Sequence, residues 1–303
     1  MSRLEQLQHF LVQLQGSIGT ALKIALRSRW RVRLPGAAEE LVIVMGNGPS
    51  LKTDLAEYGA ALQSKSTFAV NYFVNTAHYT VVRPNFYLLA APEFWLPEVT
   101  DRQREFREDT FRNLATKTEW DVQLFIPFAG LQHSYLQDRL ATLPASITIV
   151  PFNPTPVEGL RSFDFFCFRQ HWGMPRPHNV LIPATMLSIG MGFRTIGLIG
   201  VDHSWLPEIS VTEDNVALLH QKHFYDEKTS KHRPMPSLKR RPRRLYEILE
   251  KFMLAFRAYH TIDDYSRQRG SRIYNATKGS FIDAFERRSL SDLLAPRKVK
   301  THE

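Results

Sequence analysis

A polar loop bracketed by glycines follows the first long apolar run of the chain, and its side chains suit nucleotide or phosphate binding. The loop reads Gly46-Asn47-Gly48-Pro49-Ser50 and comes directly after five apolar residues. Its glycines leave room for a ligand beside the backbone, and its Asn and Ser side chains offer donors and acceptors. A tight structural turn is the alternative, because neither a Walker A loop nor a complete GxGxxG is present.

Two other segments are expected to bring polar groups beside this loop. Gly200, Asp202 and His203 follow one predicted strand, and Asn71 follows another. Carboxyl ends of parallel strands share one edge of a sheet, so Asn47, Asn71 and Asp202 are predicted to converge on one crevice. Asn71 could instead cap a turn.

Apolar runs alternate with helical segments, which predicts an α/β fold with a Rossmann-like, doubly wound, mostly parallel sheet. Strands are predicted at 41–45, 67–70, 85–90, 122–126, 146–150, 195–199 and 272–274, and helices near 51–63, 101–116, 131–141, 180–192 and 243–268.

Residues 151–177 hold five prolines, His171 and Trp172. A loop of that length is predicted to be a lid or an acceptor-binding wall.

The chain divides into three predicted parts. Residues 1–35 form a basic amphipathic helix, residues 36–290 the nucleotide-binding domain with a lid-like insertion at 206–242, and residues 291–303 a tail. The N-terminal stripe of Leu4, Leu7, Leu11, Leu14, Ile18, Ala21 and Ala25 recurs at spacings of three and four. Arginines and Trp30 follow it, which suits an anionic membrane surface; packing on the domain, or on a second copy in a homo-oligomer, is the equal alternative.

Composition favours a globular protein with an anionic partner. The formal charge is +9, yet no RRM, KH, zinc-finger or helix-turn-helix signature is present, which disfavours nucleic acid. The single cysteine, Cys167, lies in an apolar run and cannot form an internal disulfide, so a cytoplasmic location and an inert core thiol are expected. No run is long enough for a membrane span.

Four short motifs resemble one superfamily. The loop GNGPSL at 46–51 resembles the first loop of a family of bacterial sialyltransferases, and the loop of related MptE-like or motility-accessory-factor (Maf) proteins. Residues 68–71 resemble the strand whose Asn contacts the nucleotide, and 196–202 resemble the strand and loop that place an Asp in the site. Tyr274-Asn275-Ala276-Thr277-Lys278-Gly279 resembles a late motif of the MptE-like domain.

The resemblance implies a glycosyltransferase that needs no metal. Its donor would be a nucleotide-activated sugar, such as a CMP-activated sialic-acid-like or other ulosonic acid, and its acceptor a surface polysaccharide, for example lipopolysaccharide, or a lipid-linked glycan at the inner membrane face. Gly46, Asn47, Gly48, Ser50, Asn71, Gly200 and Asn275 would bind the nucleotide. Ala91, Pro92 and Glu93 stand where the family has a donor-binding Asn, so the donor sugar stays open.

The catalytic base is expected after the 200–202 loop. His220, His223 and His232 lie there, and His223 is our choice because Asp226 could orient its imidazole. Asp202 is the other catalytic candidate, and Tyr225 and Lys222 would meet the phosphate. Surface histidines on a loop are the alternative, and His220-x-x-His223 is a weak metal signal.

Two other functions stay open. An MptE-like diphosphokinase would transfer pyrophosphate from ATP to a hydroxymethylpterin and would need Mg²⁺ and clustered carboxylates, for which Asp202, Asp226 and Glu227 are available. The second open function is a membrane-attached module that binds nucleotides and has no catalytic activity.

Overall fold

The computed structural model describes residues 2–219, 224, 233–234 and 241–295. Its centre is an eight-stranded sheet in which every pairing is parallel, which confirms the predicted α/β, doubly wound fold class. The strands are β1 (Leu41–Met45), β2 (Ser66–Val70), β3 (Phe86–Leu88), β4 (Val122–Pro127), β5 (Ile147–Phe152), β6 (Thr195–Ile199), β10 (Arg272–Asn275) and β11 (Glu286–Arg287).

The strand order places a topological switch beside β1. The order is β11-β10-β6-β1-β2-β3-β4-β5, so the chain runs outward from β1 to β5 and then returns to the other side of β1. Met45 pairs with Ile199, and the two strands therefore end level with each other. Open α/β sheets bind ligands at such a switch, outside the carboxyl ends of the strands.

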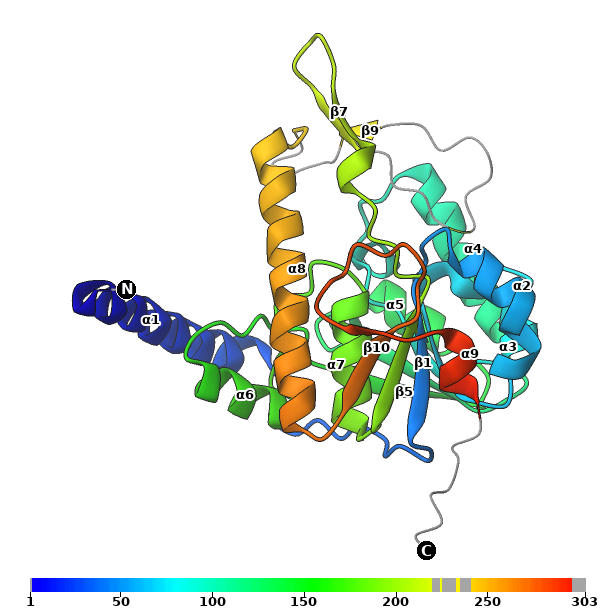
Figure 1. Cartoon of the computed structure of the whole chain (residues 1–303). Helices are drawn as coiled ribbons and strands as arrows, with labels where there is room; N and C mark the ends of the chain where they lie inside the picture. The colour runs from blue at the N-terminus through cyan, green and yellow to red at the C-terminus, as the bar shows by residue number, and fades with distance from the viewer. Residues whose placement is uncertain (1, 220–223, 225–232, 235–240, 296–303) are drawn as a thin grey trace, which may run out of the picture.

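Helices cover both faces of the sheet (Figure 1) because each central strand is apolar on both sides. Val42 and Val44 belong to one core cluster, Ile43 and Met45 to the other. The first cluster packs against α6 (Arg161–Arg169), α7 (Leu181–Met191), α8 (Leu245–Gln268) and one end of α1 (Arg3–Arg27). The second packs against α2 (Leu51–Leu62), α3 (His78–Val82), α4 (Asp101–Lys117), α5 (Ser134–Leu140) and α9 (Leu290–Leu294).

The insertion predicted at 206–242 carries a small antiparallel sheet above the carboxyl edge (Figure 1). Its strands are β7 (Ile209–Val211), β8 (Ala217–Leu219) and β9 (Arg233–Pro234). Ala217 and Leu219 pack against Ile248 and Phe252 of α8. Short 3-10 turns, η1 (Asn71–Asn75), η2 (Pro92–Phe94), η3 (Gly130–Gln132) and η4 (Leu206–Glu208), follow or precede several strands.

Two expectations about loops and boundaries were wrong. Residues 151–177 are not one long loop, because α6 lies within them and Trp172 packs on Trp30 with ring centroids 4.8 Å apart. The chain between 291 and 295 is not a free tail, since Leu290 and Leu293 of α9 are buried in the second core cluster.

The predicted core role of Cys167 is confirmed. Its side chain is fully buried in the first core cluster. Burial raises the pKa of the thiol to about 11, so the reactive thiolate is scarce at neutral pH. Among the helices described, none is both long enough and apolar enough to cross a membrane.

Candidate functional site

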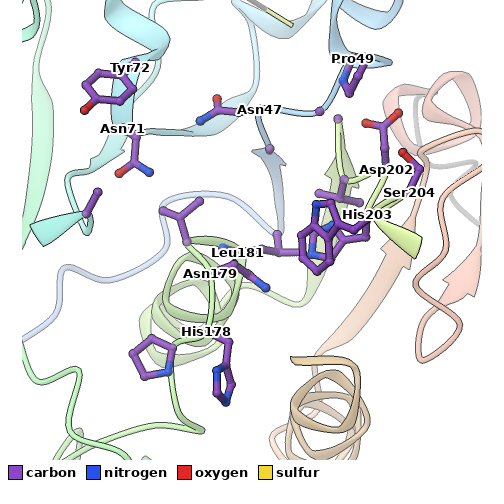
Figure 2. A pocket seen from close by; sticks show the side chains of 18 of the residues that line it. Asn47, Pro49, Asn71, Tyr72, His178, Asn179, Leu181, Asp202, His203 and Ser204 are labelled. Atoms are coloured by element: carbon purple, nitrogen blue, oxygen red, sulfur yellow. Dashed lines mark hydrogen bonds between the residues drawn. The ribbon is translucent and has the colours of Figure 1, made fainter. Parts of the chain in front are cut away.

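A pocket of about 390 Å³ lies at the switch point, within the size range of small-ligand sites. It is lined by Gly46, Asn47, Gly48, Pro49, Asn71, Tyr72, Ala91, Pro92, Glu93, Pro177, His178, Asn179, Val180, Leu181, Gly200, Val201, Asp202, His203, Ser204, Trp205 and Glu208. Figure 2 shows Asn47, Asn71 and Tyr72 on one side of the pocket, and Asp202 and Ser204 across from them. The predicted convergence of Asn47, Asn71 and Asp202 is therefore confirmed.

The glycines of the first loop bring two backbones together. The N–H of Gly46 donates to the carbonyl of Ile199, and the N–H of Gly48 to that of Gly200, both at 2.8 Å. A Cβ on Gly46 would lie 2.4 Å from the Gly200 oxygen, far inside contact distance. These two N–H groups bond the neighbouring loop, so they are not available to a phosphate.

Asp202 is tied to the start of α2. Its carboxylate accepts from the Ser50 hydroxyl at 2.8 Å and from the Ser50 N–H at 3.2 Å. A Cβ on Gly48 would lie 1.8 Å from Asp202 Oδ2, so only glycine fits there. Ser50 is not among the pocket-lining residues, and its predicted contact with a nucleotide is replaced by this bond to Asp202.

Two amide side chains line the opposite side of the pocket. Asn71 adopts a left-handed backbone conformation at φ 49°, which Asn tolerates better than most residues, and its Oδ1 accepts from Ala90 N–H at 3.3 Å. Asn47 Oδ1 is buried and has no hydrogen-bond partner among the described residues. A buried amide oxygen without a partner costs free energy, and a ligand donor could satisfy it.

A chain of hydrogen bonds fixes His203. Asn179 Oδ1 accepts from Leu181 N–H, which leaves Asn179 Nδ2 to donate to the Tyr259 hydroxyl at 2.7 Å. The hydroxyl hydrogen is then directed to His203 Nε2, 2.5 Å away. Burial lowers the pKa of His203 to about 3. His203 is therefore neutral at pH 7, and its Nε2 is occupied by the hydrogen bond from Tyr259.

Asn275 does not line the pocket, and its predicted role in nucleotide binding is wrong. Its buried side chain accepts from Thr277 N–H and donates to Ser280 Oγ. Thr277 and Ser280 in turn bond the backbone N–H and carbonyl of Val201. The motif around Asn275 thus supports the 200–202 loop from behind.

The described lining is acidic. Glu93, Asp202 and Glu208 contribute carboxylates, and no Lys or Arg is found among the described lining residues. The Glu93 carboxylate accepts from the Tyr72 hydroxyl at 3.1 Å. No group of three His, Cys, Asp or Glu side chains suited to a metal occurs in the part of the chain that the structure describes.

The predicted base and phosphate ligands, His223, Lys222 and Tyr225, lie outside the described residues. Phe224, between them, is described: its N–H donates to the Asn47 carbonyl at 3.0 Å, and its ring packs on Phe73. The insertion therefore contacts the loop at 46–50, which the sequence predicts to bind a nucleotide, through Phe224.

A second cavity of about 620 Å³ lies between α1, α6 and α8 and shares His178 with the first. Burial lowers the pKa of His178 to about 4, and the charges of Arg176, Lys251 and Arg257 act in the same direction. The imidazole is therefore neutral at pH 7.

Sequence reasoning missed Tyr72, His178 and Asn179, all of which line the pocket. Asn179 could have been found, because it precedes an apolar helix whose start must lie at the carboxyl edge of the sheet. Trp205 packs on Phe252 of the long helix, at 4.8 Å between centroids. No local pattern predicts that contact.

Comparison with known proteins gives little beyond the fold. No protein-family model matches the sequence, and no curated protein matches it. Among solved structures, the Maf glycosyltransferase from Magnetospirillum magneticum AMB-1 is similar, with 14% identity and a TM-score of 0.46 over 90% of this chain. The chain covers 38% of that structure's length. A likeness at this level carries no conclusion about activity, which has to come from the site.

Proposed function

We propose that the chain is a glycosyltransferase that binds a nucleotide-activated sugar at the switch point of its sheet. The observation that carries the proposal is the pocket in which Asn47, Asn71 and Asn179 meet Asp202 at the carboxyl edge. Amides can read the edge of a base or the hydroxyls of a ribose. Pro49, Leu181 and Trp205 supply apolar surface for rings.

The leaving phosphate needs positive charge that the described lining lacks. Lys222 and Tyr225 of the insertion are our candidates, because Phe224 between them bonds the Asn47 carbonyl. Gly46 and Gly48 serve instead as spacers that keep Asp202 at the edge of the pocket. The donor sugar is proposed to extend from the nucleotide toward His178.

We propose that the acceptor occupies the second cavity, because His178 lines both cavities. A base must contact the acceptor hydroxyl, take its proton and leave the oxygen free to attack the sugar. His178 is neutral at pH 7 and joins His223 as a candidate for this step. A surface polysaccharide or lipid-linked glycan remains the proposed acceptor class.

Donor hydrolysis tests this proposal without a known acceptor. The chain is incubated with CMP-, UDP- and GDP-sugars, and released nucleotide is measured with water as the acceptor. We expect release from one nucleotide class and its loss in Asn47→Ala. Release from none of the donors, with or without added glycan, would overturn the proposal. Comparing the pH profiles of His178→Gln and His223→Gln then identifies the base, because the fall in activity at low pH reports protonation of the base and only loss of the base removes it.

The diphosphokinase has no observation in its favour. Its magnesium would need clustered carboxylates, and no such group occurs within the described residues. Asp226 and Glu227, the carboxylates predicted for it, lie outside them.

A further inference from the structure

Helix α1 presents its apolar stripe to solvent. Side chains of Leu4, Leu7, Leu11, Ile18 and Leu22 are 52–66% exposed. Half of the large apolar side chains that the described residues expose lie between 4 and 30. Soluble monomers rarely leave so continuous an apolar surface uncovered.

The opposite side of α1 holds the helix to the body. The Thr20 hydroxyl donates to the Glu158 carbonyl at 2.8 Å, and Leu160 N–H donates to Ser17 Oγ at 2.9 Å. Gly16 sits so close that a Cβ there would lie 3.0 Å from the Glu158 oxygen. Apart from Ile24, which is buried in the first core cluster, small and polar residues form the packed side of α1, whereas a surface helix usually packs through its apolar side.

The basic segment after α1 is fixed beside the stripe. Arg29 exchanges two backbone hydrogen bonds of 2.8 Å with the Asn153 amide, and the Trp30 carbonyl accepts from Trp172 Nε1 at 3.2 Å. Arg27, Arg29, Trp30, Arg31 and Arg33 are all exposed. The apolar stripe and the basic segment that directly follows α1 are thus both exposed, and α1 extends away from the sheet (Figure 1).

We propose that this surface, formed by the exposed stripe of α1 with Trp30 and the arginines at 27–33, docks on an anionic phospholipid bilayer. Apolar side chains would enter the headgroup boundary, tryptophan would sit at the interface, and the arginines would meet lipid phosphates. The proposal concerns α1 and its basic extension and stands apart from the proposed transferase activity.

Charge decides between a bilayer and a second copy of the chain. Residues 1–33 contain six Lys or Arg and one acidic residue, Glu5. A second copy would bring the same positive charge to the interface, whereas an anionic bilayer complements it. The stripe has the three-and-four spacing of a coiled coil, so self-association is the competing outcome that the experiment has to detect.

Vesicle co-sedimentation of the full chain tests the proposal. Phosphatidylglycerol in phosphatidylcholine vesicles should bind the protein, pure phosphatidylcholine should bind it weakly, and salt should reduce binding. Replacing Arg31 and Arg33 by Gln should weaken binding about 30-fold, because each basic residue near an anionic surface contributes about 1 kcal/mol to the binding free energy. Leu7→Gln with Leu11→Gln should weaken it more than tenfold. All four side chains are exposed, so the melting temperature should not change.

Matched controls carry the same chemical changes elsewhere. Leu249→Gln with Met253→Gln removes two exposed apolar side chains from α8, and Arg104→Gln with Arg112→Gln removes two charges from α4. Both controls should bind vesicles like the wild type. Equal affinity for neutral vesicles would overturn the proposal. So would a dimer in sedimentation equilibrium that Leu7→Gln and Leu11→Gln dissociate, in a protein that binds no vesicles.

Discussion

Asp202 accepts two hydrogen bonds from Ser50, a residue 152 positions earlier in the chain. The bonds join the loop after β6 to the first turn of α2, and the positive end of that helix dipole favours the carboxylate. Asp202 therefore both borders the pocket and secures the loop that carries Asn47.

Removing the Asp202 carboxylate should destabilise the protein more than removing the Ser50 hydroxyl. Asp202→Ala loses two charge-assisted bonds and should cost about 2 kcal/mol, while Ser50→Ala loses one and should cost about 1 kcal/mol. Urea unfolding of both variants and of the double mutant measures these costs. If the cost of the double mutant equals the sum of the two single-mutant costs, the hydrogen bonds between Asp202 and Ser50 are contradicted, because residues in contact should show a coupling energy.

Gly48→Ala should separate the two loops. The new methyl would overlap Asp202 Oδ2 and lie 2.7 Å from the Gly200 oxygen, so the loss should reach about 3 kcal/mol. Gly36→Ala is the control, because a Cβ there meets nothing within 4 Å. Chemical denaturation compares the two. A Gly48→Ala protein as stable as Gly36→Ala would show that the loops are not in contact.

Asp54→Asn should stabilise the protein above about pH 6. Burial, with the nearby Asp202 charge second, raises the pKa of Asp54 from 3.8 to about 6. The folded protein therefore holds this proton more tightly than the unfolded chain, and stability falls as pH rises between those values. The gain in Asp54→Asn should grow from near zero at pH 3.8 to about 1–2 kcal/mol at pH 7, allowing for partial exposure.

The pKa of Asp164 is also raised to about 6, but that residue is unchanged in both proteins and its effect cancels from the difference. Urea midpoints across the pH range give the comparison. A gain that is the same at pH 4 and pH 7 would contradict the raised pKa of Asp54.

His203 should stay neutral throughout the physiological range. Its pKa is lowered by burial to about 3, and the Tyr259 hydroxyl donates to Nε2. Nitrogen NMR should show no titration between pH 5 and 8, and should report a change at Nε2 in Tyr259→Phe. That variant should lose about 1–3 kcal/mol of stability because two buried partners are left unpaired. Tyr246→Phe, at an exposed tyrosine of the same helix, should lose almost nothing. A midpoint near the ordinary 6.5 would contradict this account.

Periodicity and turn chemistry predicted most of the sheet. The apolar run at 41–45 became β1 with the same bounds, because five consecutive large apolar residues suit a strand buried on both faces. The short strand β11 and helix α9 were missed, since two and five residues carry no period. The outward orientation of the α1 stripe could not be predicted either, because Thr20 and Ser17 hold the helix through contacts with distant residues.

The candidate site was predicted in part. Asn47, Asn71 and Asp202 lie where strand ends had to place them. Asn275 also ends a strand, yet its amide turns back to Thr277 and Ser280, and only the tertiary fold decides between those two orientations. Tyr259, which bonds His203 and Asn179, lies in the middle of α8, and packing decides which side of that helix faces the pocket.

Nucleotide binding at the switch-point pocket tests the central claim most directly. Calorimetric titration of the whole chain with CMP, UDP and GDP should show one nucleotide bound at one site. Asn47→Ala and Asn71→Gly should each weaken it about tenfold, near 1.4 kcal/mol, with glycine chosen for the left-handed backbone at 71. Gln63→Ala, an exposed amide on the far end of α2, should bind like the wild type. Binding of none of the three nucleotides, or binding that both Asn variants leave unchanged, would contradict the account.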